Sequence, residues 1–147
     1  MQTSFTDKQL LNKDNKTSET IIRKCVHCGM CNATCPTYGV NGEELEGPRG
    51  RIYLIKDMLE NKKPATKEIA KHIDSCLSCY SCMTTCPSGV NYMHLIDHGR
   101  NYVEETYKRP FFDRLFRNIL SFVLPRPKVF LLMALSSKII KPFSFLF

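Results

Sequence analysis

The eight cysteines of this 147-residue chain fall into two sets that share one spacing. Each set reads C-x2-C-x2-C-x3-C and is followed by proline, and every cysteine of the second set lies 51 positions after its counterpart in the first. The first set is Cys25, Cys28, Cys31 and Cys35, and the second is Cys76, Cys79, Cys82 and Cys86. Thr34 and Thr85 keep the same offset, so two copies of one binding unit are the simplest interpretation.

This spacing predicts iron–sulfur clusters. Three thiolates at steps of three residues let a short loop wrap a cube of iron and sulfide, with backbone N–H groups directed at sulfur. The fourth cysteine lies too far along to complete the same cube easily, and in the two-cluster ferredoxin pattern it ligates the other cluster. We therefore expect a [4Fe-4S] cluster 1 on Cys25, Cys28, Cys31 and Cys86, and a [4Fe-4S] cluster 2 on Cys76, Cys79, Cys82 and Cys35. Such crossed ligands hold the ends of the unit together, so metal-free protein should lose its fold there.

Two other uses of the cysteines fit this spacing less well. A structural zinc ion takes four ligands, usually from paired C-x2-C knuckles, so a third cysteine at the same step would be left over. Disulfide bonds would require an oxidising compartment and fit only a few pairs within each set. His27, which directly precedes Cys28, is interpreted as a loop residue or a donor to sulfur rather than as a ligand.

The elements that position these cysteines are predicted to be helices. Residues 50–61 and 67–74 each carry their apolar residues on one face. Asn91 is the expected N-cap of a third helix that runs to Lys108 and stops before Pro110. Since no segment alternates convincingly as a β-strand would, the predicted fold class is all-α: a helical ferredoxin-like domain over residues 21–109, followed by an amphipathic helical tail.

A histidine pair and a run of acidic and then basic residues near the motifs can each be interpreted in two ways. His94 and His98 are four positions apart on the third helix, as in a metal-binding pair, but no third ligand accompanies them, so an ordinary surface helix is favoured. Three glutamates also precede a Gly-Pro-Arg-Gly-Arg run at residues 47–51. Either local ion pairs hold a turn there, or Arg49 or Arg51 offsets the negative charge of a cluster and raises its potential.

Residues 110–147 have a different character. Residues 111–124 carry apolar side chains on one side and basic or polar ones on the other, and Pro125-Arg126-Pro127 interrupts this helix. A second apolar stretch, residues 129–140, leads to a Phe-rich end. Such a tail suits packing against another subunit or a following domain, which we favour, or contact with the membrane surface.

Charge and hydropathy restrict the classes of partner. The net charge is +7, and residues 100–147 supply most of it, with nine Lys or Arg against three Asp or Glu. Basic residues gathered among apolar ones favour an anionic membrane or an acidic partner, and no nucleic-acid binding is expected. Residues 1–20 are polar, lack the apolar core of a secretory signal and are expected to be flexible. No apolar stretch approaches the roughly 20 residues that cross a bilayer, so we expect a cytoplasmic chain, with a peripheral position on the inner face of the membrane as the alternative.

The chain resembles the iron–sulfur subunits of bacterial glycolate oxidase, better called glycolate dehydrogenase, over nearly its whole length. The cysteine motifs alone are shared with the iron–sulfur subunits of anaerobic glycerol-3-phosphate dehydrogenase, lactate-oxidising complexes and heterodisulfide reductase. The resemblance rests on the double cysteine motif together with Cys35-Pro36-Thr37-Tyr38, the Gly47–Lys56 run, Thr84–Val90 and Pro125-Arg126-Pro127.

This resemblance implies an electron-transfer subunit that relays electrons from a partner flavoprotein carrying FAD towards the respiratory chain. We see no phosphate-binding glycine loop and no nucleophile–base pair in the chain, so substrate chemistry is expected on the partner. A sister dehydrogenase for lactate or glycerol 3-phosphate is the alternative, and a non-enzymatic redox sensor is a weaker one. Family members continue into two further cysteine-rich repeats, whereas no cysteine follows Cys86 here. We therefore interpret residues 110–147 as the start of a longer region, with a shortened relative as the alternative.

Overall fold

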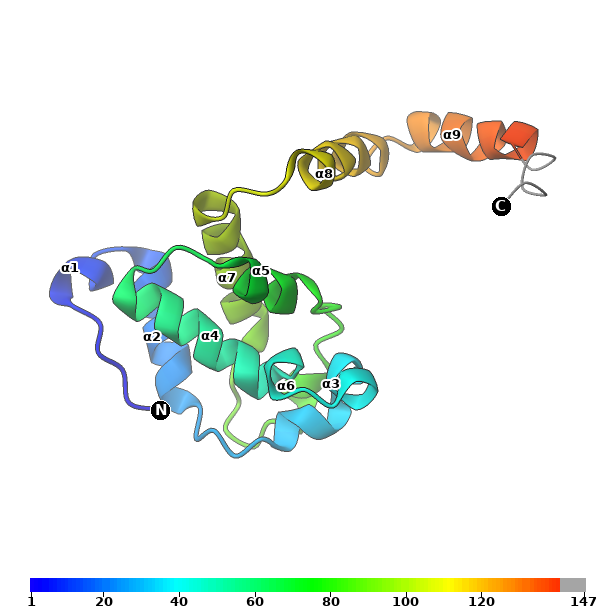
Figure 1. The fold of residues 1–147 in the computed structure, drawn as a ribbon. Helices are drawn as coiled ribbons and strands as arrows, with labels where there is room; N and C mark the ends of the chain where they lie inside the picture. The colour runs from blue at the N-terminus through cyan, green and yellow to red at the C-terminus, as the bar shows by residue number, and fades with distance from the viewer. Residues whose placement is uncertain (141–147) are drawn as a thin grey trace. The chain divides into compact units, whose positions relative to one another are not determined.

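The structure is a computed structural model that describes residues 1–140, with side chains described to residue 135. The described residues form helices and contain no β-strand, as the sequence predicts (Figure 1). The chain divides into two units, Met1–Tyr107 and Lys108–Phe147. The Phe-rich end at residues 141–147 lies outside the described residues.

The first residues of the chain differ from the flexible segment that the sequence suggests. They form α1 (Asp7–Leu10) and α2 (Lys13–Lys24), and the side chain of Asn12 caps α2 by accepting from two backbone N–H groups. Gln9 is buried and its Nε2 donates to the carbonyl oxygens of Leu59 and Glu60, at 2.8 and 2.9 Å. Polar side chains of this segment thus find partners inside the fold, and composition alone could not show that.

The three helices predicted around the motifs are present. They are α4 (Pro48–Asn61), α5 (Lys67–Asp74) and α7 (Tyr92–Thr106). Asn91 caps α7 as predicted, accepting from the backbone N–H of His94 at 3.3 Å. The helix ends two residues earlier than predicted, where Tyr107 adopts an extended conformation. Short helices complete the unit: η1 (Met30–Thr34), α3 (Pro36–Asn41), η2 (Glu44–Glu46) and α6 (Ser81–Thr85).

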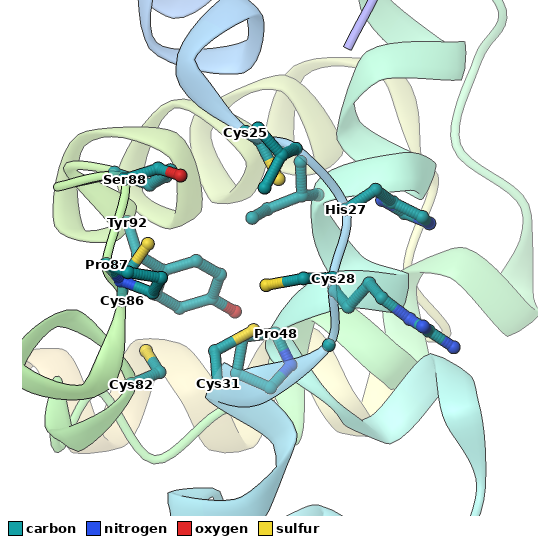
Figure 2. Close-up of a pocket in the computed structure, with 15 residues that line it drawn as sticks. Cys25, His27, Cys28, Cys31, Pro48, Cys82, Cys86, Pro87, Ser88 and Tyr92 are labelled. Atoms are coloured by element: carbon teal, nitrogen blue, oxygen red, sulfur yellow. The ribbon is translucent and has the colours of Figure 1, made fainter.

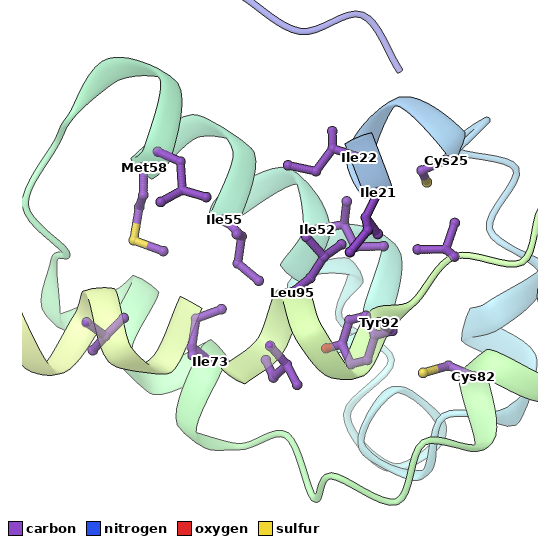
Figure 3. Packing of buried hydrophobic residues seen from close by; sticks show 14 of the residues in the cluster. Ile21, Ile22, Cys25, Ile52, Ile55, Met58, Ile73, Cys82, Tyr92 and Leu95 are labelled. Atoms are coloured by element: carbon purple, nitrogen blue, oxygen red, sulfur yellow. The ribbon is translucent and has the colours of Figure 1, made fainter. Parts of the chain in front are cut away.

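The core of the first unit lies between α2, α4, α5 and α7 (Figure 3). Ile22, Ile55, Ile73, Leu95 and Ile96 are fully buried there. Gly99 allows the close approach of α4 and α7, since a Cβ at this position would lie 2.8 Å from Cγ1 of Ile55. Two cysteines, Cys25 and Cys82, belong to the same cluster of buried residues. The hydrophobic core therefore continues directly into the walls of the cysteine site.

The second unit contains α8 (Phe111–Val123) and α9 (Pro127–Ile140). Its helices match the two apolar stretches of the tail, and most of the large apolar side chains of α8 are exposed. Among the described residues, no single helix has the length and apolar character of a membrane span. Phe111–Val123 and Pro127–Leu135 reach that threshold only when taken together, across a bend of 112°.

Candidate iron–sulfur centre

The fold gathers all eight cysteines around two neighbouring pockets. Pocket 1 is lined by Cys25, Cys28, Cys31, Cys82 and Cys86, and pocket 2 by Cys35, Cys76, Cys79 and Cys82. In Figure 2 the sulfur atoms of Cys28, Cys31 and Cys86 point into a common space. The fourth cysteine of each set thus lies with the first three of the other set, and Cys82 borders both pockets.

The two repeats also meet at equivalent residues. The hydroxyl of Thr85 donates to that of Thr34 at 3.2 Å, and the two residues are 51 positions apart. Thr34 lies at the end of η1 and Thr85 at the end of α6, the two short helices that follow the cysteine loops. Equivalent residues that contact each other place the repeats face to face. This arrangement carries each fourth cysteine across to the opposite loop.

The loops between the cysteines share an unusual backbone. His27 and Gly29 have positive φ angles of 58° and 85°, and their counterparts Ser78 and Tyr80 have φ angles of 52° and 56°. A left-handed residue other than glycine costs about 1 to 2 kcal/mol, and such strain is concentrated at functional sites. Alternating conformations of this kind turn successive N–H groups toward one side, as in anion-binding nests. In the second loop the N–H of Ser81 faces Cys79 and lowers the pKa of that thiol.

The thiols themselves are crowded. Burial and then the neighbouring thiolates raise the pKa of Cys31 to about 11 and that of Cys82 to about 12. Buried thiols of this kind stay protonated at neutral pH, but a coordinated metal deprotonates them outright. None of the eight cysteines forms a disulfide bond. The donor set therefore suits a thiophilic metal centre, in which sulfur ligands prefer zinc or an iron–sulfur cluster.

The separation of the sulfur atoms favours a cluster over a single zinc ion. In a tetrahedral zinc site with bonds of about 2.3 Å, the four sulfur atoms lie about 3.8 Å from one another. All eight cysteines are described, and no three of their sulfur atoms lie within 4.8 Å of one another. Thiolates bound to different iron atoms of one cube lie farther apart than this, which agrees with the wider spacing of the cysteine sulfur atoms.

The Gly-Pro-Arg-Gly-Arg run supports the site from one side. A Cβ at Gly47 would lie 2.5 Å from Oδ1 of Asn32, and one at Gly50 would lie 2.8 Å from the Cα of Leu45. Gly50 is therefore needed for α4 to approach η2, because its Cβ would meet backbone atoms, whereas a Cβ at Gly47 would meet only the side chain of Asn32. Pro48 occupies the first turn of α4, where its missing N–H is not required.

The two arginines of this run form two ion pairs with the same five-residue separation. Arg49 pairs with Glu44 at 2.5 Å, and Arg51 pairs with Glu46 at 2.8 Å. The first pair is one-third to two-fifths exposed, whereas Arg51 and Glu46 are 1% and 2% exposed. Arg49 lines pocket 1 and Arg51 lines pocket 2. Both sequence interpretations are thus compatible with the structure, because the local ion pairs exist and the arginine of each pair lines a cysteine pocket.

Arg51 is the centre of a buried polar network. Its Nε donates to the carbonyl oxygen of His72 at 2.6 Å, and its Nη atoms donate to the hydroxyl of Thr37 at 3.1 Å. Nη1 also lies 4.0 Å from Sγ of Cys35. Burial alone would raise the pKa of Glu46, but hydrogen bonds with Ser75 and His72 and the charge of Arg51 hold that pKa below its usual value. A carboxylate is thereby kept ionised inside the fold.

Sequence reasoning missed four residues of the site: Thr37, His72, Ser75 and Tyr92. Tyr92 lies at the start of α7 and is one of the residues around pocket 1 in Figure 2. It also borders pocket 2 and is 3% exposed, with its hydroxyl 3.7 Å from Sγ of Cys76. Burial, followed by the charge of Cys76, raises the pKa of Tyr92, so its hydroxyl stays a donor at neutral pH. The only available signal was the position of each of these residues within six of a cysteine or next to the N-cap of α7.

The histidines singled out in the sequence have different surroundings. The ring of His27 points away from the sulfur atoms in Figure 2, and its buried Nδ1 has no hydrogen-bond partner. Nδ1 of His98 contacts the hydroxyl of Ser18 at 2.7 Å, and the rings of His94 and His98 are 6.1 Å apart. His94 and His98 line a surface pocket that Asp14 of α2 also borders. Sequence spacing could not reveal this neighbour.

The geometry and the comparisons agree on the class of protein. Residues 21–90 match the family described as the 4Fe-4S dicluster domain, and this range contains all eight cysteines. Residues 21–90 are therefore similar to the dicluster class of iron–sulfur domains, and the described residues of the chain form helices without strands.

Particular relatives narrow this class. The chain is 48% identical to the glycolate oxidase iron–sulfur subunit of Escherichia coli over 143 residues, which cover 97% of this chain and 35% of that protein. It is 32% identical to the probable glycolate oxidase iron–sulfur subunit of Bacillus subtilis over 119 residues, covering 80% of this chain and 27% of that protein. A succinate dehydrogenase iron–sulfur subunit from Paracoccus denitrificans is 30% identical over 76 residues, covering 48% and 29%. No solved structure matches the chain.

These matches confirm the resemblance expected from the motifs. The chain resembles the iron–sulfur subunits of glycolate oxidase, and its residues 21–90 match a 4Fe-4S domain family. It spans about a third of the length of the curated relatives that it matches over most of its own length.

Proposed function

We propose that this chain holds two [4Fe-4S] clusters and relays single electrons between them within a glycolate dehydrogenase. Cluster 1 would be held by Cys25, Cys28, Cys31 and Cys86, and cluster 2 by Cys76, Cys79, Cys82 and Cys35. The observation that carries the proposal is the interleaving of the repeats, which places four thiols of this crossed set around each of two adjoining pockets.

The residues of the chain have defined tasks in such a relay. The clusters, when bound, supply reversible one-electron transfer. The cysteine loops hold the ligands, and backbone N–H groups such as that of Ser81 stabilise negative charge on sulfur. The apolar core adjoining Cys25 and Cys82 keeps water from one side of the site, and shared walls such as Cys82 and Tyr92 keep the two pockets close.

The electron donor proposed for this relay is an FAD-containing dehydrogenase subunit that oxidises glycolate. The names of the two glycolate oxidase relatives support this choice of substrate. A sister complex acting on lactate or glycerol 3-phosphate remains the second candidate, because the cysteine spacing is common to such subunits. In either case the reaction of the substrate belongs to the partner.

We assign residues 21–109 to the cluster domain and residues 110–147 to a docking segment of a cytoplasmic complex. On α8 the exposed apolar side chains include Phe112 and Phe116, with Arg114 and Arg117 nearby in sequence. Packing against a partner subunit or a following domain is the proposed use of this face, with peripheral membrane contact as the alternative. Flotation of the purified protein with anionic vesicles separates the two, since only membrane contact predicts co-flotation that weakens at high salt.

The test of the relay is an anaerobic purification from the native host with partners retained. Eight iron and eight sulfide per chain are expected, and glycolate should produce electron paramagnetic resonance signals of reduced clusters. Signals produced by lactate or glycerol 3-phosphate instead would assign the chain to a sister complex. Four iron per chain, or a salt-sensitive affinity for DNA without any response to these substrates, would contradict the relay.

The crossed ligand assignment has its own test. Cys35→Ser and Cys86→Ser change the fourth ligands of the two motifs, and each variant should alter the signal of the cluster whose other three ligands come from the opposite set. Cys28→Ser provides the comparison for cluster 1, and Cys79→Ser provides it for cluster 2. If Cys35→Ser alters the same signal as Cys28→Ser, each motif binds its own cluster and the crossed assignment is wrong.

A further inference from the structure

The two cysteine pockets differ in the groups that face their sulfur atoms. The segment from Glu44 to Arg51 presents one arginine to each pocket, Arg49 to pocket 1 and Arg51 to pocket 2, and each arginine is paired with a glutamate. The pair at pocket 1 is partly exposed and the pair at pocket 2 is buried. Because hydrogen bonds to sulfur, local charge and solvent exposure set cluster potentials, this difference bears on the order in which two clusters would be reduced.

Pocket 2 is rich in donors to sulfur. Besides the guanidinium of Arg51 at 4.0 Å, the hydroxyl of Thr37 lies 3.2 Å from Sγ of Cys35, although its one proton can also go to the carbonyl oxygen of Glu46 at 2.7 Å. The hydroxyl of Tyr92 donates to Cys76 at 3.7 Å. Opposing these groups, the carbonyl oxygen of Glu46 lies 3.7 Å from the sulfur of Cys35.

The positive end of the buried pair is the end that faces sulfur. Arg51 contacts Cys35 and Thr37, whereas the carboxylate of Glu46 is held by Arg51, Ser75 and His72. A second arginine, Arg100, donates to the hydroxyl of Ser78 and to the carbonyl oxygen of Cys76, both at 2.6 Å. Charges act more strongly at buried positions because water screens them less.

Among the described side chains, none donates a hydrogen bond to the sulfur of Cys25, Cys28, Cys31 or Cys86. Tyr92 also borders pocket 1, but its hydroxyl donates to Cys76. The side-chain group recorded at a sulfur atom there is Oδ1 of Asn32, a lone-pair acceptor 4.0 Å from Cys31. Arg49 lies over Gly29, where its Nη1 would be 3.0 Å from an added Cβ, but it is paired with Glu44 and partly exposed. Its effect on a cluster is therefore screened by solvent.

We propose that the protein sets the two clusters at different potentials, with cluster 2 above cluster 1, through Arg51 and Tyr92 at the sulfur atoms of Cys35 and Cys76. This inference rests on the proposed function, because it requires two clusters with the crossed ligands. Donors and positive charge stabilise the reduced, more negative cluster. With both clusters bound, an electron that entered at cluster 1 would move downhill to cluster 2, from the loop of residues 25–31 to the loop of residues 76–82.

The test is an anaerobic redox titration of the full chain with both clusters bound, followed by electron paramagnetic resonance. Two reduction waves are expected. Tyr92→Phe keeps the buried ring and removes only the hydroxyl, so it should make cluster 2 about threefold to tenfold harder to reduce. For a one-electron couple this equals a lowering of the higher wave by about 30 to 60 mV. Tyr102→Phe, on the same helix and away from the cysteines, is the matched control and should move neither wave.

A second pair of variants tests the sign of the effect at each pocket. Glu46→Gln removes the counter-charge of Arg51 and should raise the higher wave. Glu44→Gln removes the counter-charge of Arg49 and should raise the lower wave. This shift should be smaller, because that pair is partly exposed. If Glu46→Gln does not retain its clusters, Tyr92→Phe still decides the proposal by itself.

The outcomes separate the inference from the function beneath it. Four iron per chain would contradict the two-cluster relay itself, whereas eight iron with a single wave would leave the relay intact and overturn the proposed difference in potential. If the protein binds eight iron and shows two waves, but Tyr92→Phe lowers the lower wave, both waves or neither wave, the relay is intact and the assigned order of potentials is wrong. A lowering of the higher wave alone supports the assigned order.

Discussion

The buried pair of Arg51 and Glu46 allows the strongest prediction about stability. We consider Arg51→Gln, Glu46→Gln and the double variant, which keep polar side chains of similar length but remove one or both charges. Two unit charges 2.8 Å apart attract by about 6 kcal/mol at an effective dielectric constant of about 20. Desolvation of both groups offsets part of this attraction, and removal of one partner of a buried pair typically costs about 3 to 5 kcal/mol.

The two single variants should not lose the same amount of stability. Arg51→Gln leaves the carboxylate of Glu46 buried near an anionic cluster, with only Ser75 and His72 as partners. Glu46→Gln leaves Arg51 with the carbonyl of His72, the hydroxyl of Thr37 and the proposed anionic cluster at Cys35. We therefore expect Arg51→Gln to be the more destabilising change, and the double variant to lose less stability than the sum of the two single variants.

The assay is thermal unfolding of the cluster-loaded protein under anaerobic conditions. For a unit of 107 residues, about 1 kcal/mol shifts the midpoint by about 4 to 8 °C, so Arg51→Gln should lower the apparent midpoint by at least about 12 °C. Cluster loss makes unfolding irreversible, so all variants are compared at one scan rate. Additive losses in the double variant, or a greater loss in Glu46→Gln than in Arg51→Gln, would refute the reasoning that a charged pair and an adjoining anion share this site.

Further expectations concern glycine packing, helix capping and the metal. Gly50→Ala should lower cluster content and the unfolding midpoint, because its Cβ would press on the backbone of Glu44 and Leu45, whereas Gly39→Ala, with nothing within 4 Å of the new Cβ, should leave cluster content unchanged; iron analysis compares the two. Asn91→Ala should lower stability by about 1 kcal/mol through loss of the cap on α7, and Asn101→Ala within the same helix should have a smaller effect, both seen in the midpoint. Removal of iron by a chelator should lower the helical circular dichroism signal, since Cys25 and Cys82 are part of the core; full recovery requires iron and sulfide together, and an unchanged signal after iron loss would show that the fold does not depend on the metal.

Local sequence patterns predicted the helices well where side-chain periodicity and caps were strong. The range of α5 was obtained from its apolar stripe, and α7 was found together with its Asn91 cap. Prediction failed for α2, because its polar surface resembles a flexible leader and its packing depends on α7 and α4, which are distant in the sequence. The end of α7 was placed two residues late because Lys108 and Arg109 carry no stop signal of their own.

The sequence by itself indicates the candidate ligand residues, since the spacing of eight cysteines is a local property that only a few metal centres satisfy. It also determined the helical class and the resemblance to iron–sulfur subunits. Tertiary structure decided which groups surround each pocket: the Thr34–Thr85 contact between the repeats, the burial of Arg51 and Glu46 beside one pocket, and the placement of Tyr92 at Cys76. These features depend on which distant segments pack together and on how much water each position loses, and neither quantity can be obtained from spacing along the chain.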